Sequence, residues 1–204
     1  VQVATRGHNS TFIGTYAPHQ GPQHDEHRED YWEELGNIIA KHPPSSPIYV
    51  MGDFNTRIHA RKTEEQHVIG PHIFGLGLQH LEGTPEHPPS PQPNRKHFID
   101  LASEKHMVIA NTFKSPKLEH RASYREISTK RGTPIAPESY AQLDHMLVSR
   151  SWLPSVFRTR TYPYQEWNSN HYLMIALIQV RLGARHVYNT PEPKLQYRLQ
   201  HDHE

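Results

Sequence analysis

An acid and an amide stand two residues apart in the segment Gly52-Asp53-Phe54-Asn55, directly after an apolar run. A carboxylate at such a position binds a metal ion or deprotonates a water molecule, and a carboxamide donates hydrogen bonds to a phosphate oxygen. Asp53 and Asn55 are therefore candidates for chemistry at a phosphate group. The same pair also suits a plain turn at the end of a strand, and these four residues alone do not separate the two interpretations.

Two later polar clusters also stand beside apolar runs. Gln142-Leu143-Asp144-His145 opens one such run, and Ser169-Asn170-His171 directly precedes another. A buried Asp near a His fixes the imidazole tautomer and stabilises its cation, which suits a His that meets a developing oxyanion. Each cluster alone is typical of ordinary strand ends, but three of them in one chain favour a shared site. For His145 we expect packing or a hydrogen bond rather than chemistry.

The elements that position these residues follow from apolar periodicity. The apolar segment 47–51 predicts a buried strand, and the glycine at its end allows a tight turn. An earlier strand is predicted over 11–16, ending at a Tyr-Ala-Pro segment. Helical spacing of apolar residues predicts a helix over 25–41, which the proline-rich segment 42–46 ends. The acid and amide are thus expected where a strand of a layered α/β fold ends, a common place for ligands.

The remaining sequence predicts one further helix and several more strands. Residues 56–94 are expected to form a long loop region, irregular in its later half because proline, histidine and glycine dominate it. A helix is predicted over 95–105. Strands are predicted over 107–111, 122–127, 143–149, 156–162 and 171–182. Residues 1–182 are thus expected to form one α/β domain, and the segment 183–204, which contains Pro-Glu-Pro, a linker or tail.

Composition limits the possible classes of protein. The chain has 204 residues, of which 34% are hydrophobic, enough for one domain with a core. It carries 22 basic and 21 acidic residues, so its overall charge does not indicate a nucleic-acid partner. It contains no cysteine, which excludes disulfides and thiolate metal sites. No apolar run is long enough to cross a bilayer, and the 18 histidines are scattered along the chain.

The order of the motifs resembles that of the endonuclease/exonuclease/phosphatase superfamily. The matching motifs are Tyr-Ala-Pro (16–18), Gly-Asp-Phe-Asn (52–55), Gln-Leu-Asp-His (142–145) and Ser-Asn-His (169–171). Segments 68–72, 111–113 and 147–152 resemble the apurinic-type endonuclease domain of non-LTR retrotransposons and the craniofacial development protein 2-like group. The resemblance covers roughly residues 10–182. It implies a four-layered α/β sandwich, two packed sheets flanked by helices, with the active site at one rim.

The resemblance also implies a reaction and residues that perform it. The reaction is phosphodiester hydrolysis with Mg²⁺ or Mn²⁺, in which charge builds on the phosphoryl oxygens. Asp53 matches the acid that positions or deprotonates the attacking water, and it is an expected metal ligand. Asn55 and Tyr16 match residues that contact the phosphate. His171 matches the histidine that stabilises the transition state, and Asp144 matches the carboxylate that orients it.

Two weaker matches and two departures follow from the same resemblance. Asn111 matches an asparagine that lines the site and contacts phosphate or DNA, and Ser123 stands where many relatives carry threonine. Asn170, the second expected metal ligand, replaces an aspartate, and a neutral amide oxygen binds a hard cation more weakly. Relatives carry strands with a metal-binding glutamate upstream of the tyrosine motif, whereas here no matching Glu precedes Tyr16. We therefore expect an N-terminally truncated domain with impaired activity.

Three functions remain open at this point. The first is a DNA endonuclease that nicks target DNA for reverse transcription, in a parent polypeptide that carries a reverse transcriptase. The second is a degenerate, non-catalytic remnant with weak nucleic-acid binding. The third is a phosphoesterase for small molecules or lipids, because a fold does not fix its substrate. The expected partner is DNA, with no membrane and no obligate protein partner, in the nucleus or cytoplasm by analogy with retroelements.

Overall fold

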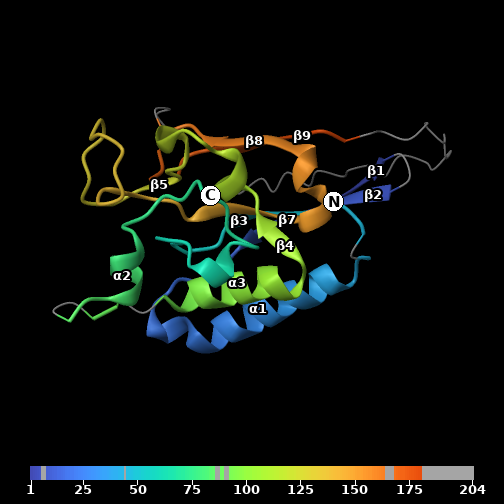
Figure 1. Ribbon diagram of the computed structural model, residues 1–204, viewed down its shortest axis with the longest axis horizontal. Helices are drawn as coiled ribbons and strands as arrows, with labels where there is room; N and C mark the ends of the chain where they lie inside the picture. The colour runs from blue at the N-terminus through green and yellow to red at the C-terminus, as the bar shows by residue number, and fades with distance from the viewer. Residues whose placement is uncertain (6–7, 44, 86–87, 90–91, 164–167, 181–204) are drawn as a thin grey trace, which may run out of the picture.

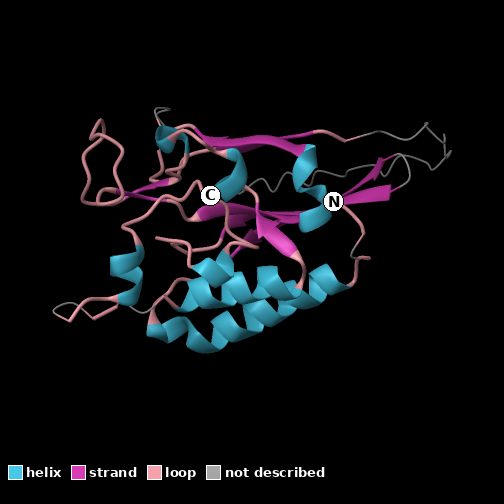
Figure 2. Cartoon of the chain, viewed as in Figure 1, coloured by secondary structure: helices cyan, strands magenta, loops and turns pink. Residues whose placement is uncertain are grey.

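The computed structural model describes residues 1–5, 8–43, 45–85, 88–89, 92–163 and 168–180. A central sheet is covered on one face by the helices α1 (Asp25–Ala40) and α3 (Pro93–Glu104), which lie at the bottom of Figure 1. The ribbon of β8 (Val156–Thr161) and β9 (Met174–Ile178) lies on the opposite side of that sheet. Figure 2 shows the same layering of helices and strands. The predicted α/β class with packed sheets and flanking helices is confirmed.

The central sheet has five strands in the order β1-β2-β3-β7-β4. β2 and β3 are parallel, and the other neighbouring pairs are antiparallel. Its strands are β1 (Gln2–Thr5), β2 (His8–Tyr16), β3 (Ile48–Asp53), β4 (Met107–Ile109) and β7 (Asp144–Ser149). Two separate antiparallel pairs accompany this sheet, one formed by β8 and β9 and the other by β5 (Tyr124–Arg125) and β6 (Tyr140–Ala141).

The register of the central strands places three polar residues in a row. Tyr16 at the end of β2 pairs with Asp53 at the end of β3, and Asp53 pairs with Asp144 at the start of β7. Side chains of directly paired residues point to the same face of a sheet. β2 and β3 approach closely here: a Cβ atom added to Gly52 would lie only 1.8 Å from the carbonyl oxygen of Thr15. Glycine at position 52 is therefore a condition for this register.

Two apolar layers hold the sheet in place. The layer between helices and sheet contains Trp32, Leu35, Ile39, Val50, Phe54, Phe98 and Leu147. The layer between the sheet and the β8–β9 ribbon contains Tyr49, Val108, Met146, Val148 and Val156. Alternate residues of β3 and β7 thus face opposite layers, as the two-residue period of a strand requires. Because both faces of the sheet are covered, these strands read as continuous apolar runs in the sequence.

The predicted helices are confirmed; the differences lie at strand ends, in the long loop, and in β1 and β6, two short strands that were not predicted. The predicted strand over 107–111 ends at Ile109, because Asn111 begins the short helix α4 (Asn111–Lys114). The region 56–94 contains short helical turns, and its start is anchored to α3 by the buried Arg95–Glu65 ion pair at 2.7 Å. The short elements there and later are η1 (Pro22–His24), η2 (Thr63–Glu65), α2 (Leu78–Glu82), η3 (Leu118–His120) and η4 (Arg150–Ser155).

The last predicted strand, over 171–182, begins later than expected, at Met174 of β9. The reason is local: the backbone of Tyr172 donates a hydrogen bond to Ser123, so the residues before β9 pair with the β5 segment instead of with β8. Residues 181–204, which include the predicted linker 183–204, lie outside the described residues. Among the helices that the structure describes, none is long and apolar enough to cross a membrane.

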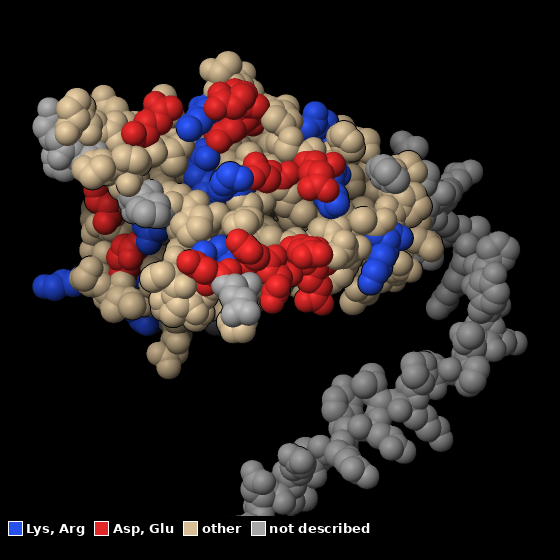
Figure 3. Space-filling view, turned by 90° about the horizontal axis from the view of Figure 1, so that it is seen from below, with Lys and Arg blue, Asp and Glu red and all other residues tan. Residues whose placement is uncertain are grey.

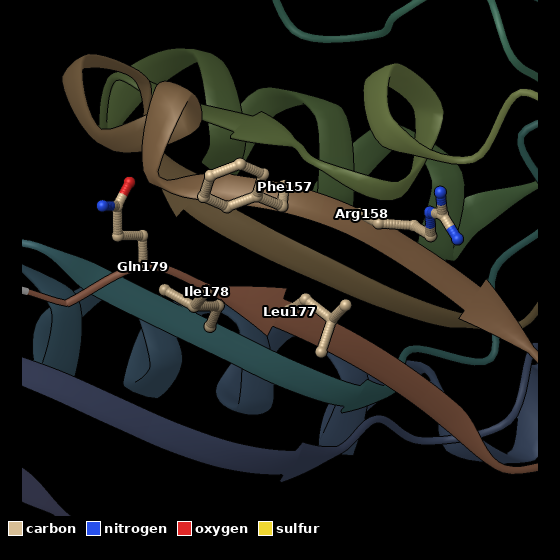
Figure 4. A pocket seen from close by; sticks show the side chains of 5 residues that line it. All are labelled: Phe157, Arg158, Leu177, Ile178 and Gln179. Carbon is tan, nitrogen blue, oxygen red and sulfur yellow. The ribbon is translucent and has the colours of Figure 1, made fainter.

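The two outer layers differ in character. The exposed face of α1 is rich in acids, which appear in red on the helix side of the molecule in Figure 3; they are Asp25, Glu29, Asp30, Glu33 and Glu34. On the β8–β9 ribbon, Phe157 and Leu177 are 66% and 57% exposed. They line a hollow of about 450 Å³ together with Arg158, Ile178 and Gln179 (Figure 4).

Candidate active site

His171 lies between the two carboxylates of the row described above. Its Nδ1 is 3.2 Å from Oδ2 of Asp144, and its Nε2 is 3.6 Å from Oδ2 of Asp53. The three residues come from chain positions far apart, yet the register of β3 and β7 and the segment before β9 bring them together. An imidazole with one nitrogen on a carboxylate presents its other nitrogen in a fixed direction. The structure thus assembles the predicted Asp53, Asp144 and His171 at the rim of the sheet.

Asp53 is the most buried acid of this group, with a side-chain exposure of 9%. Burial raises the pKa of Asp53, because removal from water penalises the charged form, and the charge of Asp144 raises it further. The backbone N–H of Asn55, which donates to Oδ1 at 2.8 Å, and nearby His171 act in the opposite direction. A carboxylate whose pKa is raised toward neutrality accepts a proton more readily, as a general base must.

His171 is half-buried and surrounded by negative charge. The hydrogen bond to Asp144 raises the pKa of His171, and the charges of Asp144 and Asp53 add to this effect, while burial opposes it. The ring of Tyr124 stands edge-on to the imidazole, with ring centroids 4.9 Å apart. His171 is therefore held as a cation-forming group with a fixed ring orientation. That arrangement stabilises negative charge on an oxygen that approaches the exposed side of the imidazole.

Ser123 is hydrogen-bonded both to the segment that carries Asp144 and to the residue that follows His171. Its buried hydroxyl accepts the backbone N–H groups of Leu143 and Asp144 at 2.9 and 3.0 Å. Its carbonyl oxygen accepts the N–H of Tyr172 at 2.8 Å. Ser123 therefore fixes the backbone beside both Asp144 and His171. Ser123 is only a weak match to a family position in the sequence, and its hydrogen bonds to distant segments become visible only in the tertiary structure.

Tyr16 is the exposed member of the row, with 62% of its surface accessible. Its hydroxyl lies 3.2 Å from Nε2 of His19, which is also exposed. The sequence did not single out His19, although the prolines around it predict a short fixed turn directly after the strand. Among the groups that shift the pKa of Asp53, nearby His19 has the smallest effect, and it lowers that pKa. Tyr16 and His19 thus form one polar wall of the site.

Asn55 lies beside Asp53 but turns its amide inward. Its backbone is left-handed, with φ of 45°, a conformation that asparagine tolerates better than most residues. Its side-chain Nδ2 donates to the backbone carbonyl oxygen of Ala17 at 2.6 Å. Its backbone carbonyl oxygen accepts hydrogen bonds from the side-chain amides of Gln20 and Asn94. Asn55 therefore ties the end of β3 to the end of β2. Its predicted contact with phosphate stays a prediction.

Asn111 is not at the surface of the site. It is 1% exposed, and its Oδ1 accepts the backbone N–H of Met146 at 3.0 Å. Its Nδ2 donates to Nδ1 of His145 at 3.1 Å, while Nε2 of His145 donates to the carbonyl of Thr56. The expected packing role of His145 is confirmed. A phosphate contact by Asn111 stays a prediction, because the structure gives its amide two internal partners.

Asn170 is hydrogen-bonded to the guanidinium group of Arg125. Its Oδ1 accepts a hydrogen bond of 2.8 Å from Nη2 of Arg125, and its backbone carbonyl accepts the N–H of the same arginine at 2.9 Å. The sequence did not predict this partner, which stands 45 residues earlier in the chain. Arg125 therefore holds the segment that carries His171 and occupies the oxygen that was expected to bind a metal.

The described residues do not fit a divalent cation as a preformed centre. Among them, no three His, Cys, Asp or Glu side chains are placed to hold one metal ion together. Asp53 and Asp144 both face His171, whose raised pKa favours a positive charge at that place. The guanidinium of Arg125 donates a hydrogen bond to Oδ1 of Asn170. A hard cation needs several oxygen ligands free of competing cations, which this arrangement does not provide.

Comparison with known sequences gives one family and a group of relatives. The sequence pattern described as Endonuclease/Exonuclease/phosphatase family matches residues 2–163. Craniofacial development protein 2 of Tragulus javanicus is 24% identical over 176 residues, which cover 85% of this chain and 26% of that protein. The protein of the same name from Bos taurus is 24% identical over 176 residues, covering 85% and 25%. The chain spans about a quarter of the length of these curated relatives.

Solved structures share the fold at low sequence identity. The AP endonuclease from Archaeoglobus fulgidus superposes with a TM-score of 0.57 at 16% identity, covering 83% of this chain and 61% of that one. The 3′ phosphatase NExo from Neisseria, bound to a product DNA hairpin, gives 0.56 at 15%, covering 87% and 63%. The endonuclease domain of TRAS1, a telomere-specific non-LTR retrotransposon, gives 0.52 at 13%, covering 88% and 60%. By sequence pattern and by fold, this chain belongs to the endonuclease/exonuclease/phosphatase family.

Proposed function

We propose that this chain is the catalytic unit of a DNA endonuclease of the retrotransposon type, which nicks target DNA for reverse transcription. The observation that carries the proposal is the position of His171 between Asp53 and Asp144 at the rim of the sheet. Two likenesses support DNA as the substrate: one neighbouring structure holds a DNA hairpin, and another is the endonuclease domain of a non-LTR retrotransposon.

The chemistry follows from the charge states of these residues. Asp53, whose pKa burial raises, accepts a proton from water as the water oxygen attacks phosphorus. One P–O bond forms, the P–O bond to the leaving oxygen breaks, and that oxygen takes a proton from solvent to leave as the alcohol. The imidazolium of His171, held through Nδ1 by Asp144, stabilises the charge that builds on the phosphoryl oxygens. Tyr16 lies in the same row and offers its exposed hydroxyl to the phosphate.

The expected dependence on Mg²⁺ or Mn²⁺ is part of this proposal and is tested by adding each metal. The described residues do not complete a site for such an ion, so we expect slow turnover by this chain.

The test is a plasmid-nicking assay with Mg²⁺, with Mn²⁺ and with EDTA. His171→Ala is expected to lower the nicking rate by about 100-fold or more, the usual contribution of a positioned acid–base or charge-stabilising group. His27→Ala, at an exposed position of α1, is the matched control and is expected to nick at the unaltered rate. Equal nicking by the unaltered chain and by His171→Ala would assign the activity to a contaminant or to another site.

A second candidate function is nucleic-acid binding without catalysis. The observation that favours it is the hydrogen bond between Arg125 and Asn170, since this contact removes an oxygen expected to bind the metal. DNA binding that persists while no nicking occurs with either metal would favour this function over hydrolysis.

A further inference from the structure

A small cavity lies where η3 and the segment before it meet β8. Its volume is about 210 Å³, and the residues that line it include Lys117, Arg158 and Arg160. No acidic residue lines it, and within the described part of the chain these three cations form no ion pair. The guanidinium of Arg160 is supported by the ring of Tyr162, whose centroid lies 4.3 Å away. The cavity is therefore strongly positive.

The size and the chemistry of the cavity indicate the ligand. Pockets for drug-sized molecules begin at about 300 Å³, so this cavity suits a small group and not a nucleobase with its sugar. Guanidinium groups bind phosphate through paired charge-assisted hydrogen bonds. The neighbouring hollow in Figure 4 is different, because Phe157, Leu177 and Ile178 make it apolar and Arg158 extends away from Phe157.

The cavity is connected to the candidate active site through β9, the partner strand of β8, which begins three residues after His171. Thr159 of β8 pairs with Ala176 of β9, which follows His171 by five residues. Five residues of chain span at most about 17 Å. One strand of B-DNA places a phosphate about every 3.4 Å along its axis. A phosphate a few nucleotides from the one at His171 therefore lies within this distance. The acidic face of α1 lies on the far side of the central sheet, at the bottom of Figure 1.

We propose that this cavity is a phosphate-binding subsite, which takes one backbone phosphate of the nucleic acid whose scissile phosphodiester reaches His171. The inference rests on the proposed function and adds to it a second contact that positions the substrate. Lys117, Arg158 and Arg160 supply the positive charge and the hydrogen-bond donors.

The experiment measures binding of a short fluorescein-labelled DNA duplex by fluorescence anisotropy, in EDTA and at several salt concentrations. The double variant Lys117→Gln/Arg158→Gln tests the cavity. Lys41→Gln/Lys96→Gln removes the same charge from the helix layer and is the matched control. A separate arm measures the thermal shift that inorganic phosphate produces in the unaltered chain and in the cavity variants.

We expect the cavity double variant to bind DNA about tenfold more weakly and to lower the slope of log K against log salt by about 1 to 2. The control double variant is expected to leave affinity and slope nearly unchanged. Equal losses in the cavity and control variants would overturn the subsite, as would an unchanged affinity. A thermal shift with inorganic phosphate that the cavity variants abolish, at unchanged DNA affinity, would assign the cavity to free phosphate instead.

Failure of the subsite is distinguishable from failure of the proposed function. If the unaltered chain nicks DNA and the cavity variants bind it equally well, only the subsite falls. If the cavity variants bind DNA more weakly but His171→Ala nicks like the unaltered chain, the subsite stands and the assigned hydrolysis falls.

Discussion

Arg125 and Asn170 are joined by a hydrogen bond of 2.8 Å from Nη2 of the guanidinium to Oδ1 of the amide. A second bond, from the backbone N–H of Arg125 to the backbone carbonyl of Asn170, makes the contact two-pointed. Since His171 follows Asn170 directly, Arg125 fixes the segment that carries the histidine. The contact also explains why an amide is accommodated where an aspartate is expected from the family resemblance.

Restoring the aspartate alone is not expected to restore metal binding. In Asn170→Asp the new carboxylate forms an ion pair with Arg125, worth about 1 kcal/mol or less because both side chains are partly exposed. Mn²⁺ affinity, measured by electron paramagnetic resonance, is expected to stay unchanged in this variant. It is expected to rise in Asn170→Asp/Arg125→Gln, where the oxygen is free. A rise in the single variant would show that Arg125 does not compete with the cation.

The charge state of His171 is expected to depend on Asp144. The hydrogen bond to Asp144 raises the pKa of His171 above its ordinary value, so Asp144→Asn is expected to lower it. Because the folded pKa is raised, this pair stabilises the fold below the unfolded pKa, and the stabilisation is lost as pH rises through the folded pKa. NMR titration of the His171 ring measures the shift, with Asp100→Asn on α3 as control. An unchanged titration in Asp144→Asn would rule out this orientation of the ring.

The buried histidines are expected to limit stability in acid. Burial lowers the pKa of His145 to about 4 and that of His59 to about 4. The unfolded chain binds these protons first, near pH 6.5, so stability is lost as pH falls from there toward 4. Each group is expected to cost about 1 to 2 kcal/mol between pH 6.5 and 5, at about 1.4 kcal/mol per pKa unit. Urea unfolding at the two pH values measures the loss.

His145→Gln is the informative variant for this prediction. A glutamine can keep the partners Asn111 and Thr56 without titrating, so the loss between the two pH values is expected to shrink even if the variant is less stable at pH 7. His27→Gln, which is exposed, is expected to retain the full loss. An unchanged pH dependence in His145→Gln would mean that other groups govern acid unfolding.

Two glycines of neighbouring strands are expected to respond oppositely to alanine. In Gly52→Ala the added Cβ meets the carbonyl oxygen of Thr15 at 1.8 Å, so β2 and β3 must separate beside Asp53. We expect a cost of about 3 kcal/mol, at the upper end for overpacking. Gly14→Ala has open space around the new atom and is expected to be neutral or slightly stabilising. Thermal unfolding measures both, and equal effects would disprove the close approach.

The sequence was informative where a pattern is local. Apolar spacing predicted α1 and α3, and the three motifs at strand ends predicted Asp53, Asp144 and His171 as neighbours, which the structure confirms. The motif order came from a resemblance, but the reason that these residues meet is the register of β3 with β7, which no local pattern encodes.

The rest was not predictable because it depends on contacts between distant segments. Arg125 reaches Asn170 only after β5 has folded beside the segment before β9. The positive cavity combines Lys117 with Arg158, from elements that sequence reasoning treated separately. The inward amides of Asn55 and Asn111 look in the sequence like surface donors, and burial decides otherwise.

The row of paired residues Tyr16, Asp53 and Asp144 also has a consequence for biosynthesis. Its strands are joined through long stretches of chain, and His171 completes the group only near the end of the domain. Proteins are synthesised from the N-terminus, and pairings between distant strands form slowly. A nascent chain therefore carries no working constellation until residue 171 has left the ribosome and β7 has inserted between β3 and β4. If the proposed function holds, partly made copies are expected to leave phosphodiesters intact.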